Sequence, residues 1–234
     1  MSHLLRLLLI GALCVAGATC RGAALEVSPV RHDMAVGRQT LGMTVANRGA
    51  IATTVQVRAF NWTHDHEGRD TLTPATEVLV SPAIFSLEAG RSQTVRALFG
   101  DGATETSPNY RLLIDEIPAT SAAEPVRFAL RLSVPVFRQA AVPAPASLSW
   151  RLEGRRAKLV AVNAGATHER LRDLQLVSAQ GAAARPTSPW GPYLLGGHSR
   201  HWSVDAGVLN PGDRWTLTAL TDVGRIEVPL VVAP

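Results

Sequence analysis

The chain has 234 residues, of which 46% are hydrophobic and 18% are charged, and its formal net charge is +4 at pH 7. The 23 basic and 19 acidic residues form no run of like charge, which argues against a nucleic-acid-binding protein. The length allows either one large hydrophobic core or two of ordinary size.

Residues 1–24 are predicted to be a cleavable secretory signal. Arg6 precedes an apolar stretch at 7–18, and small residues follow up to Ala24, after which we expect cleavage. The residues before Cys20 make a poor lipoprotein signal, so lipidation is not favoured. The apolar stretch is too short to span a bilayer and no later segment approaches that length, so no stable membrane insertion is expected. The mature protein is therefore expected to be exported into an oxidising compartment.

Alternating apolar residues in short runs, separated by Gly, Pro, Asn and Asp, predict an all-β protein. No helical period is sustained over a helical length. The first half should form one immunoglobulin-like β-sandwich over residues 25–138. Its expected strands are residues 25–34, 41–46, 53–62, 77–80, 93–99, 110–117 and 126–137.

The segment 139–146 is predicted to be a linker, because it carries two prolines and no charge. The alternating pattern resumes after it and predicts a second, smaller β-sandwich over residues 147–234. We therefore expect two sandwich domains with a cleft between them. The expected strands of the second domain are residues 148–152, 157–163, 171–178, 193–195, 200–204, 214–220 and 224–232.

The longest alternating run ends the first domain. It places one apolar face on a single strand, made of Val126, Phe128, Leu130, Leu132, Val134 and Val136. One interpretation is a last strand that closes the core of its own domain. The other is an edge strand that pairs with a partner, which Pro135 favours because proline donates no backbone hydrogen bond. A long apolar edge is an aggregation hazard unless something covers it.

Four blocks of sequence, in this order, resemble the PapD-like periplasmic chaperones of chaperone-usher pili, especially the archaic branch of spore-coat-U and Csu type. The block from Tyr110 to Pro118, closely followed by the alternating run, is the most specific. The other three are Leu25 to Arg31, Val45 to Asn47 and Val80 to Arg96.

The resemblance implies a non-enzymatic chaperone without a cofactor that works by donor-strand complementation. Its partners would be pilus subunits with incomplete immunoglobulin-like folds and an outer-membrane usher. The donor strand would present Val126, Phe128, Leu130, Leu132 and Val134 to the subunit. The alternative is an exported two-domain adhesin or glycan-binding module whose long strand closes its own core.

In this family a basic pair in the cleft binds the carboxylate at the C-terminus of the subunit. Arg31 matches the first member of the pair by its place in the opening strand. The usual second member is a lysine, but its position falls at Pro135, so we expect Arg111 to replace it, with Arg96 as the next candidate. The family also places an ionic network at the hinge between the domains, for which the nearest matches are Glu116, Arg138 and Asp222.

Other side-chain groups are expected to be solvated or to pack in a core rather than to form a site. His64 and His66 fall in an expected hairpin loop and should be solvated rather than bind a metal, and the same holds for His198 and His201. No hydrolase elbow, phosphate loop or zincin motif occurs, so no catalytic residues and no metal site are expected. Aromatic residues gather in the second domain and are expected in its core rather than on a sugar-binding surface; they are Trp150, Trp190, Tyr193, Trp202 and Trp215.

Overall fold

A computed structural model describes the chain except residues 1–24, 101–107, 118–128, 140–143, 155 and 206–208. The predicted secretory signal therefore lies outside the described residues. All regular elements of the described part are strands, and this part contains no helix that is long and apolar enough to cross a membrane. The ten strands of the first half are β1 (Leu25–Ser28), β2 (His32–Met34), β3 (Thr40–Asn47), β4 (Thr53–His64), β5 (Asp70–Pro74), β6 (Val78–Ser81), β7 (Ile84–Leu87), β8 (Ser92–Phe99), β9 (Asn109–Ile117) and β10 (Arg131–Arg138).

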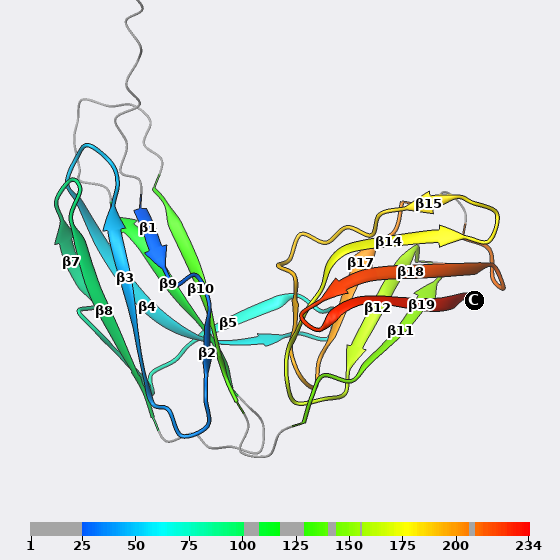
Figure 1. The fold of residues 1–234 in the computed structure, drawn as a ribbon, viewed down its shortest axis with the longest axis horizontal. Coiled ribbons are helices and arrows are strands. Elements are labelled where there is room, and N and C mark those ends of the chain that lie inside the picture. Colours follow the sequence, from blue (N-terminus) through cyan, green and yellow to red (C-terminus); the bar gives the residue numbers. More distant parts are fainter. Residues whose placement is uncertain (1–24, 101–107, 118–128, 140–143, 155, 206–208) are drawn as a thin grey trace, which may run out of the picture.

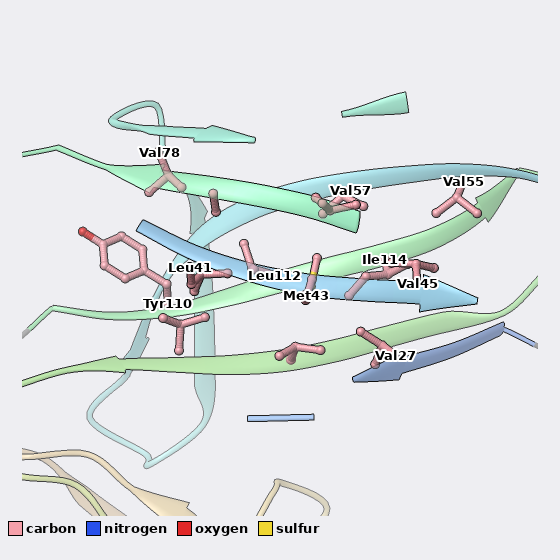
Figure 2. Close-up of a cluster of buried hydrophobic side chains, with 14 of the residues drawn as sticks. Val27, Leu41, Met43, Val45, Val55, Val57, Val78, Tyr110, Leu112 and Ile114 are labelled. Atoms are coloured by element: carbon pink, nitrogen blue, oxygen red, sulfur yellow. The ribbon is translucent and has the colours of Figure 1, made fainter. Parts of the chain in front are cut away.

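These strands form two sheets that face each other. One sheet has the order β1-β3-β8-β6, and the other has the order β2-β10-β9-β4-β5 with β7 paired to β4. Alternate residues of both sheets point inward, as the pattern of β8 shows, where Val95, Ala97 and Phe99 are buried. Figure 2 shows the core between the sheets, with Leu41, Met43 and Leu112 among its members.

The second half forms a separate sandwich around its own core. Its main sheet path is β15-β14-β18-β19-β11-β12-β17, and β13 pairs with β16. Leu152, Leu176 and Leu217 lie at the centre of this core. The strands are β11 (Leu148–Glu153), β12 (Lys158–Asn163), β13 (Glu169–Arg170), β14 (Arg172–Ser178), β15 (Ala183–Ala184), β16 (Tyr193–Leu194), β17 (Ser199–Ser203), β18 (Arg214–Thr221) and β19 (Gly224–Ala233).

The all-β, two-sandwich prediction is confirmed, but the opening strand expected over 25–34 is two strands. β1 pairs with β3 in one sheet, whereas β2 pairs with β10 in the other. Pro29 explains the break, because it has no N–H with which to continue the ladder. As a consequence Arg31 lies immediately before β2 rather than inside a longer strand.

The hairpin of β4 and β5 reaches from the first sandwich toward the second (Figure 1). Gly68, at its turn, has φ +72, and a Cβ atom there would lie 2.8 Å from the Cα of Arg200. A side chain at this position would therefore collide with the backbone of β17. The sequence predicts the hairpin but not this contact, and β5 and β7 are two strands that it does not predict.

Candidate functional site

The first half of β10 is an open sheet edge. Along one side β10 pairs with β9 over its whole length, from Arg131 to Phe137. Along the other side its partner β2 covers only Val136 to Arg138. Residues 131–135 therefore have no strand on this side within the described part of the chain.

Two hydrogen bonds show which backbone groups face the open edge. The N–H of Glu116, on the β9 side, donates to the carbonyl of Leu130 at 2.9 Å, while the N–H of Gln139 donates to Met34 on the β2 side at 3.0 Å. Backbone hydrogen bonding alternates along an antiparallel pair of strands. The backbone groups of even-numbered residues of β10 therefore bond to β9, and those of odd-numbered residues face away from it. The backbone groups of Arg131 and Ser133 point to the open edge. Pro135, also on that side, has no N–H to leave unpaired.

The side chains on the inward face of β10 are buried to different degrees. Val134 and Val136 are 1% and 0% exposed and belong to the core of the first sandwich. Leu132 is half-buried against that core, and Leu130 is 37% exposed. The sandwich closes over the later residues of the strand, so in this conformation Val134 is not free for a partner, contrary to its predicted role. Of the other predicted donor residues, Val126 and Phe128 lie outside the described residues.

Arg31 lies where the open edge ends. His32 is the first residue of β2 and stands opposite Val136, so Arg31 immediately precedes the strand that closes the edge. Its Nε and Nη2 donate to the carboxylate of Asp33 at 2.8 and 3.0 Å, and Nη1 donates to Asp222 at 3.1 Å. Burial alone would lower the pKa of Arg31, but Asp33 and Asp222 raise it above its usual value. The guanidinium is therefore a fixed positive charge at the end of the edge.

A histidine from the second sandwich also contacts this arginine. The Nε2 atom of His168 lies 2.9 Å from Nη2 of Arg31, and its ring stacks on Phe137 at 3.4 Å between centroids. Burial, together with the nearby charge of Arg31, lowers the pKa of His168 to about 4. The neutral ring therefore accepts a hydrogen bond from Arg31. A cavity of about 600 Å³ opens beside this group and is lined by residues of both sandwiches.

Arg111 occupies a different place from Arg31. Its guanidinium lies 3.7 Å above the ring of Trp62 and 3.6 Å from the carboxylate of Asp70, and its side chain is only 12% exposed. Burial lowers its pKa. In the sheet, β10 separates β9, which carries Arg111, from β2, which follows Arg31. The two arginines thus lie on opposite sides of β10 in the sheet.

Arg96 is not part of the cleft. It lies on β8, opposite Gly42 and Ser81, in the sheet that does not contain β10. Its side chain is exposed. The structure therefore separates this candidate from the other two.

The network expected at the hinge is not formed. The register of β9 and β10 places Glu116 beside Leu130, at the far end of the ladder from Arg138. Arg138 donates to the carbonyl of Gly100 at 3.2 Å instead, and Asp222 pairs with Arg31. The three residues cannot meet because about seven strand residues, roughly 23 Å, separate the two ends.

A different group joins the two sandwiches, and the sequence analysis did not find it. Trp62 and Phe137 from the first sandwich pack with Tyr193 and Leu195 from the second. Next to them His64, expected in a solvated loop, has a fully buried side chain. The one available signal was that His64 follows Trp62 at the strand period, so both side chains point to the same face of β4.

The polar partners of His64 fix its protonation. The backbone N–H of Leu195 donates to Nε2 at 3.2 Å, so Nδ1 carries the proton and lies 3.1 Å from the carboxylate of Asp70. Burial lowers the pKa of His64. Asp70 also accepts from Arg200, whose side chain is 0% exposed. One carboxylate, Asp70, thus pairs with two arginines, Arg111 from the first sandwich and Arg200 from the second. We call these residues the junction group: His64, Asp70, Arg111 and Arg200.

The remaining histidines and acids give no metal site. His66 is exposed, and His198 packs edge-on against His64 at 5.4 Å between ring centroids. Within the described residues no cluster of three or more His, Cys, Asp or Glu side chains could hold a metal ion.

Comparison with solved structures shows the same two-sandwich fold in pilus chaperones. A chain of the CsuC–CsuE chaperone–tip adhesion subunit pre-assembly complex of Acinetobacter baumannii aligns with a TM-score of 0.65 at 18% identity, covering 91% of this chain and 100% of that one. The YadV chaperone aligns with a TM-score of 0.63 at 15% identity, covering 89% and 99%. The E. coli chaperone DraB aligns with a TM-score of 0.60 at 17% identity, covering 88% and 98%.

Sequence comparison gives the family. A search of curated proteins finds no match. A family model described as the pili and flagellar-assembly chaperone, PapD N-terminal domain, matches residues 24–142, more than half of the chain. The resemblance inferred from the four sequence blocks is confirmed, and this chain belongs to the PapD-type family of pilus and flagellar assembly chaperones.

Proposed function

We propose that this protein is a periplasmic chaperone that captures pilus subunits by pairing the open edge of β10 with a subunit strand. The observation that carries the proposal is the edge itself. Within the part of the chain that the structure describes, residues 131–135 have no second strand neighbour, and Arg31 stands at the end of this edge. A subunit that lacks one strand of its own fold has an unpaired strand that such an edge can bind. β10 would supply the missing strand while it remains paired with β9.

Backbone and side chains would both contribute to capture. The outward N–H and C=O groups of Arg131 and Ser133 can pair with an incoming strand, and each such hydrogen bond contributes a net ~0.5 to 1.5 kcal/mol. Leu130 and Leu132 can pack into the subunit, and burying a leucine side chain contributes ~1.5 to 3 kcal/mol. The predicted donors Val126 and Phe128 would extend the same face.

Arg31 would set the register of the paired strands. Apolar packing alone permits a slip of two residues, because the same face then returns to the groove. A C-terminal carboxylate that reached the end of the edge could accept hydrogen bonds from Arg31, each on the order of 1.5 to 3 kcal/mol for a charged group. It would compete there with Asp33 and Asp222, which hold the guanidinium in its present orientation.

Structures of related folds support this function. The complex that contains CsuC is described as a chaperone–tip adhesion subunit pre-assembly complex of an archaic chaperone-usher system, and SafB is described in complex with the pilin SafA. By the same route we propose that this chain is exported by its cleavable signal and delivers subunits to an outer-membrane usher. It would act by binding alone, without catalysis or a cofactor.

The glycan-binding alternative lacks its aromatic platform. Trp202 and Trp215 are buried in the second core, Trp150 packs against that core, and Tyr193 lies at the junction between the sandwiches. Only Trp190, at 38% exposure, is on the surface. A row of exposed rings for stacking on sugars is therefore not present among the five aromatic residues that the sequence singled out.

Co-expression tests the proposal. The chain would be produced in a periplasm together with a small secreted β-rich pilus subunit encoded beside its gene, and the complex would be measured by size-exclusion chromatography. We expect a one-to-one complex, strongly reduced by Leu130→Asp. The matched control is Leu79→Asp, which also charges an exposed leucine, at 66% exposure on β6 of the other sheet. Equal recovery with both variants would contradict the proposal.

A further inference from the structure

The open edge of β10 begins beside two consecutive carboxylates at the end of β9. Asp115 and Glu116 point to opposite faces of the sheet, because neighbouring residues in a strand alternate. Both contact the first residues of β10. The function described above uses neither side chain.

Asp115 binds β10 from the outer face. One of its carboxylate oxygens accepts a hydrogen bond from Nε of Arg131, and the other accepts bonds from Nη2 and Nε of Arg58 at 2.6 and 3.2 Å. The acid is 12% exposed, whereas Arg58 and Arg131 are 41% and 60% exposed. Burial alone would raise the pKa of Asp115, but the two arginines lower it. The carboxylate therefore ties β4, β9 and β10 together across one face of the sheet.

Glu116 binds the same place from the other face. Its Oε2 atom accepts the backbone N–H of Leu130 at 3.2 Å, and its Oε1 atom accepts the hydroxyl of Thr53 at 3.1 Å. Its own N–H donates to the carbonyl of Leu130. A side chain thus takes the N–H that the β9 backbone would take in a regular ladder, at Leu130, the residue before β10 begins.

An edge strand needs such support at this end. At its other end β10 is held by β9 and β2 on both sides, but at Leu130 and Arg131 β9 is the only neighbouring strand among the described residues. Strand ends with one neighbour and few buried side chains open with little free energy. An edge that frays must be ordered again at the moment of binding, which weakens binding.

We propose that Asp115 and Glu116 are positioning residues that hold the start of the donor strand in register on β9 before a subunit binds. The inference rests on the proposed function in naming what the strand is held for. The two carboxylates fix the end of the open edge that is remote from Arg31. The edge is thereby defined at both ends, by carboxylates at its start and by the cationic Arg31 at its finish.

The first experiment uses the free protein, so it does not depend on a subunit. Amide hydrogen exchange would be measured by NMR for Leu130 and Leu132, whose N–H groups face Glu116 and β9. We expect Asp115→Asn and Glu116→Gln to speed this exchange about tenfold or more, since 1.4 kcal/mol corresponds to a factor of ten. Glu26→Gln, which breaks the exposed pair with Arg48 on β1, is the matched control and should leave these amides unchanged.

A variant with less risk to folding removes the exposed partner instead. Arg131→Gln frees one side of Asp115 while Arg58 still neutralises the carboxylate, so the fold should survive. Affinity for a subunit that binds the unmodified protein should fall about tenfold in Asp115→Asn, Glu116→Gln and Arg131→Gln. Unchanged exchange at both leucines in the two carboxylate variants would overturn the inference, and so would full affinity in folded variants with faster exchange. If no subunit binds the unmodified protein, the proposed function fails, while the exchange result still decides whether the carboxylates order the strand.

Discussion

The open edge of β10 and the junction between the two sandwiches differ in how they treat polar groups: the edge exposes backbone groups, and the junction buries polar side chains. At the edge, backbone groups of Arg131 and Ser133 face outward, and Leu130 is exposed. At the junction, the side chains of His64 and Arg200 are fully buried and both contact the carboxylate of Asp70. The edge leaves backbone donors and acceptors available to a partner, whereas the junction pairs most of its polar groups internally and leaves Nε of Arg200 and Nε1 of Trp62 buried without a partner among the described residues.

One sheet thus contains both a region that can pair with a partner and a region that fixes the second sandwich. β10 belongs to both regions, because its start is open while Phe137, near its end, packs against Tyr193 and His168 of the second sandwich. A rigid junction would hold the second sandwich at a constant angle to the edge. Each of the following predictions changes one region and asks whether the other responds.

The largest effect is expected from Asp70→Ala. The substitution leaves Arg200 and Arg111 buried beside His64 without their anion. Removing one partner of a buried ion pair costs about 3 to 5 kcal/mol. Urea unfolding should show this loss. Glu26→Ala, which breaks an exposed pair, should cost no more than about 1 kcal/mol, and an equally small loss for Asp70→Ala would show that the junction is not stabilised by this group.

The next largest effect is a dependence of stability on pH from His168. Its pKa in the folded state, about 4, lies below its ordinary value of 6.5, so the unfolded chain binds the proton more readily between these values. Stability is therefore fully present above pH 6.5 and falls as the pH drops toward 4, by on the order of 2 to 3 kcal/mol from this residue. His64, whose pKa is also lowered by burial, contributes with the same sign.

His168→Phe isolates that contribution. A phenyl ring keeps the stack on Phe137 but has no nitrogen to accept from Arg31 or to bind a proton. The slope of unfolding free energy against pH between 6.5 and 4 should become flatter than in the unmodified protein. An unchanged slope would mean that His168 is not the titrating group.

A smaller effect is expected from Gly68→Ala at the tip of the hairpin. Both the positive φ and the contact with Arg200 oppose a side chain there. Gly37→Ala is the matched control, because Gly37 has φ +76 but no atom within 4 Å of an added Cβ. The control should lose about 1 kcal/mol from backbone strain alone, whereas Gly68→Ala should lose more and change the interdomain distance in small-angle X-ray scattering. Equal losses would show that the hairpin tip does not brace the second sandwich.

The smallest effect on stability is expected from Leu130→Asp. The leucine is 37% exposed, and a surface substitution of this kind usually changes stability by less than about 0.5 kcal/mol. Thermal unfolding would check this value. A loss as large as that for Asp70→Ala would mean that the edge is part of the core rather than a surface held open for a partner.

The sequence predicted those parts of the molecule that depend on local pattern. The alternation of apolar residues located most strands. The family resemblance singled out Arg31, which lies at the end of the open edge. The break at Pro29 was missed, although the apolar residues shift there from odd positions (Leu25, Val27) to even ones (Val30, Met34) and Pro29 has no N–H for the ladder. Glu116 and Arg138 were grouped by analogy, but the antiparallel register places them at opposite ends of one ladder.

The junction group could not be predicted from local pattern. His64 and Arg200 are 136 positions apart, and a histidine after a strand is usually solvated. Only the docking of the β4–β5 hairpin against β17 brings them together. The same holds for His168 and Arg31, whose contact spans 137 positions.

The most direct measurement is amide hydrogen exchange at Arg131 and Ser133 before and after a pilus subunit binds. Both N–H groups face the open edge, so they should exchange rapidly in the free protein. If a subunit strand pairs with β10, both amides become protected in the complex while the amides of Thr94 and Arg96, in the other sheet, keep their rates. A stable complex in which Arg131 and Ser133 exchange as fast as before would contradict strand pairing at this edge.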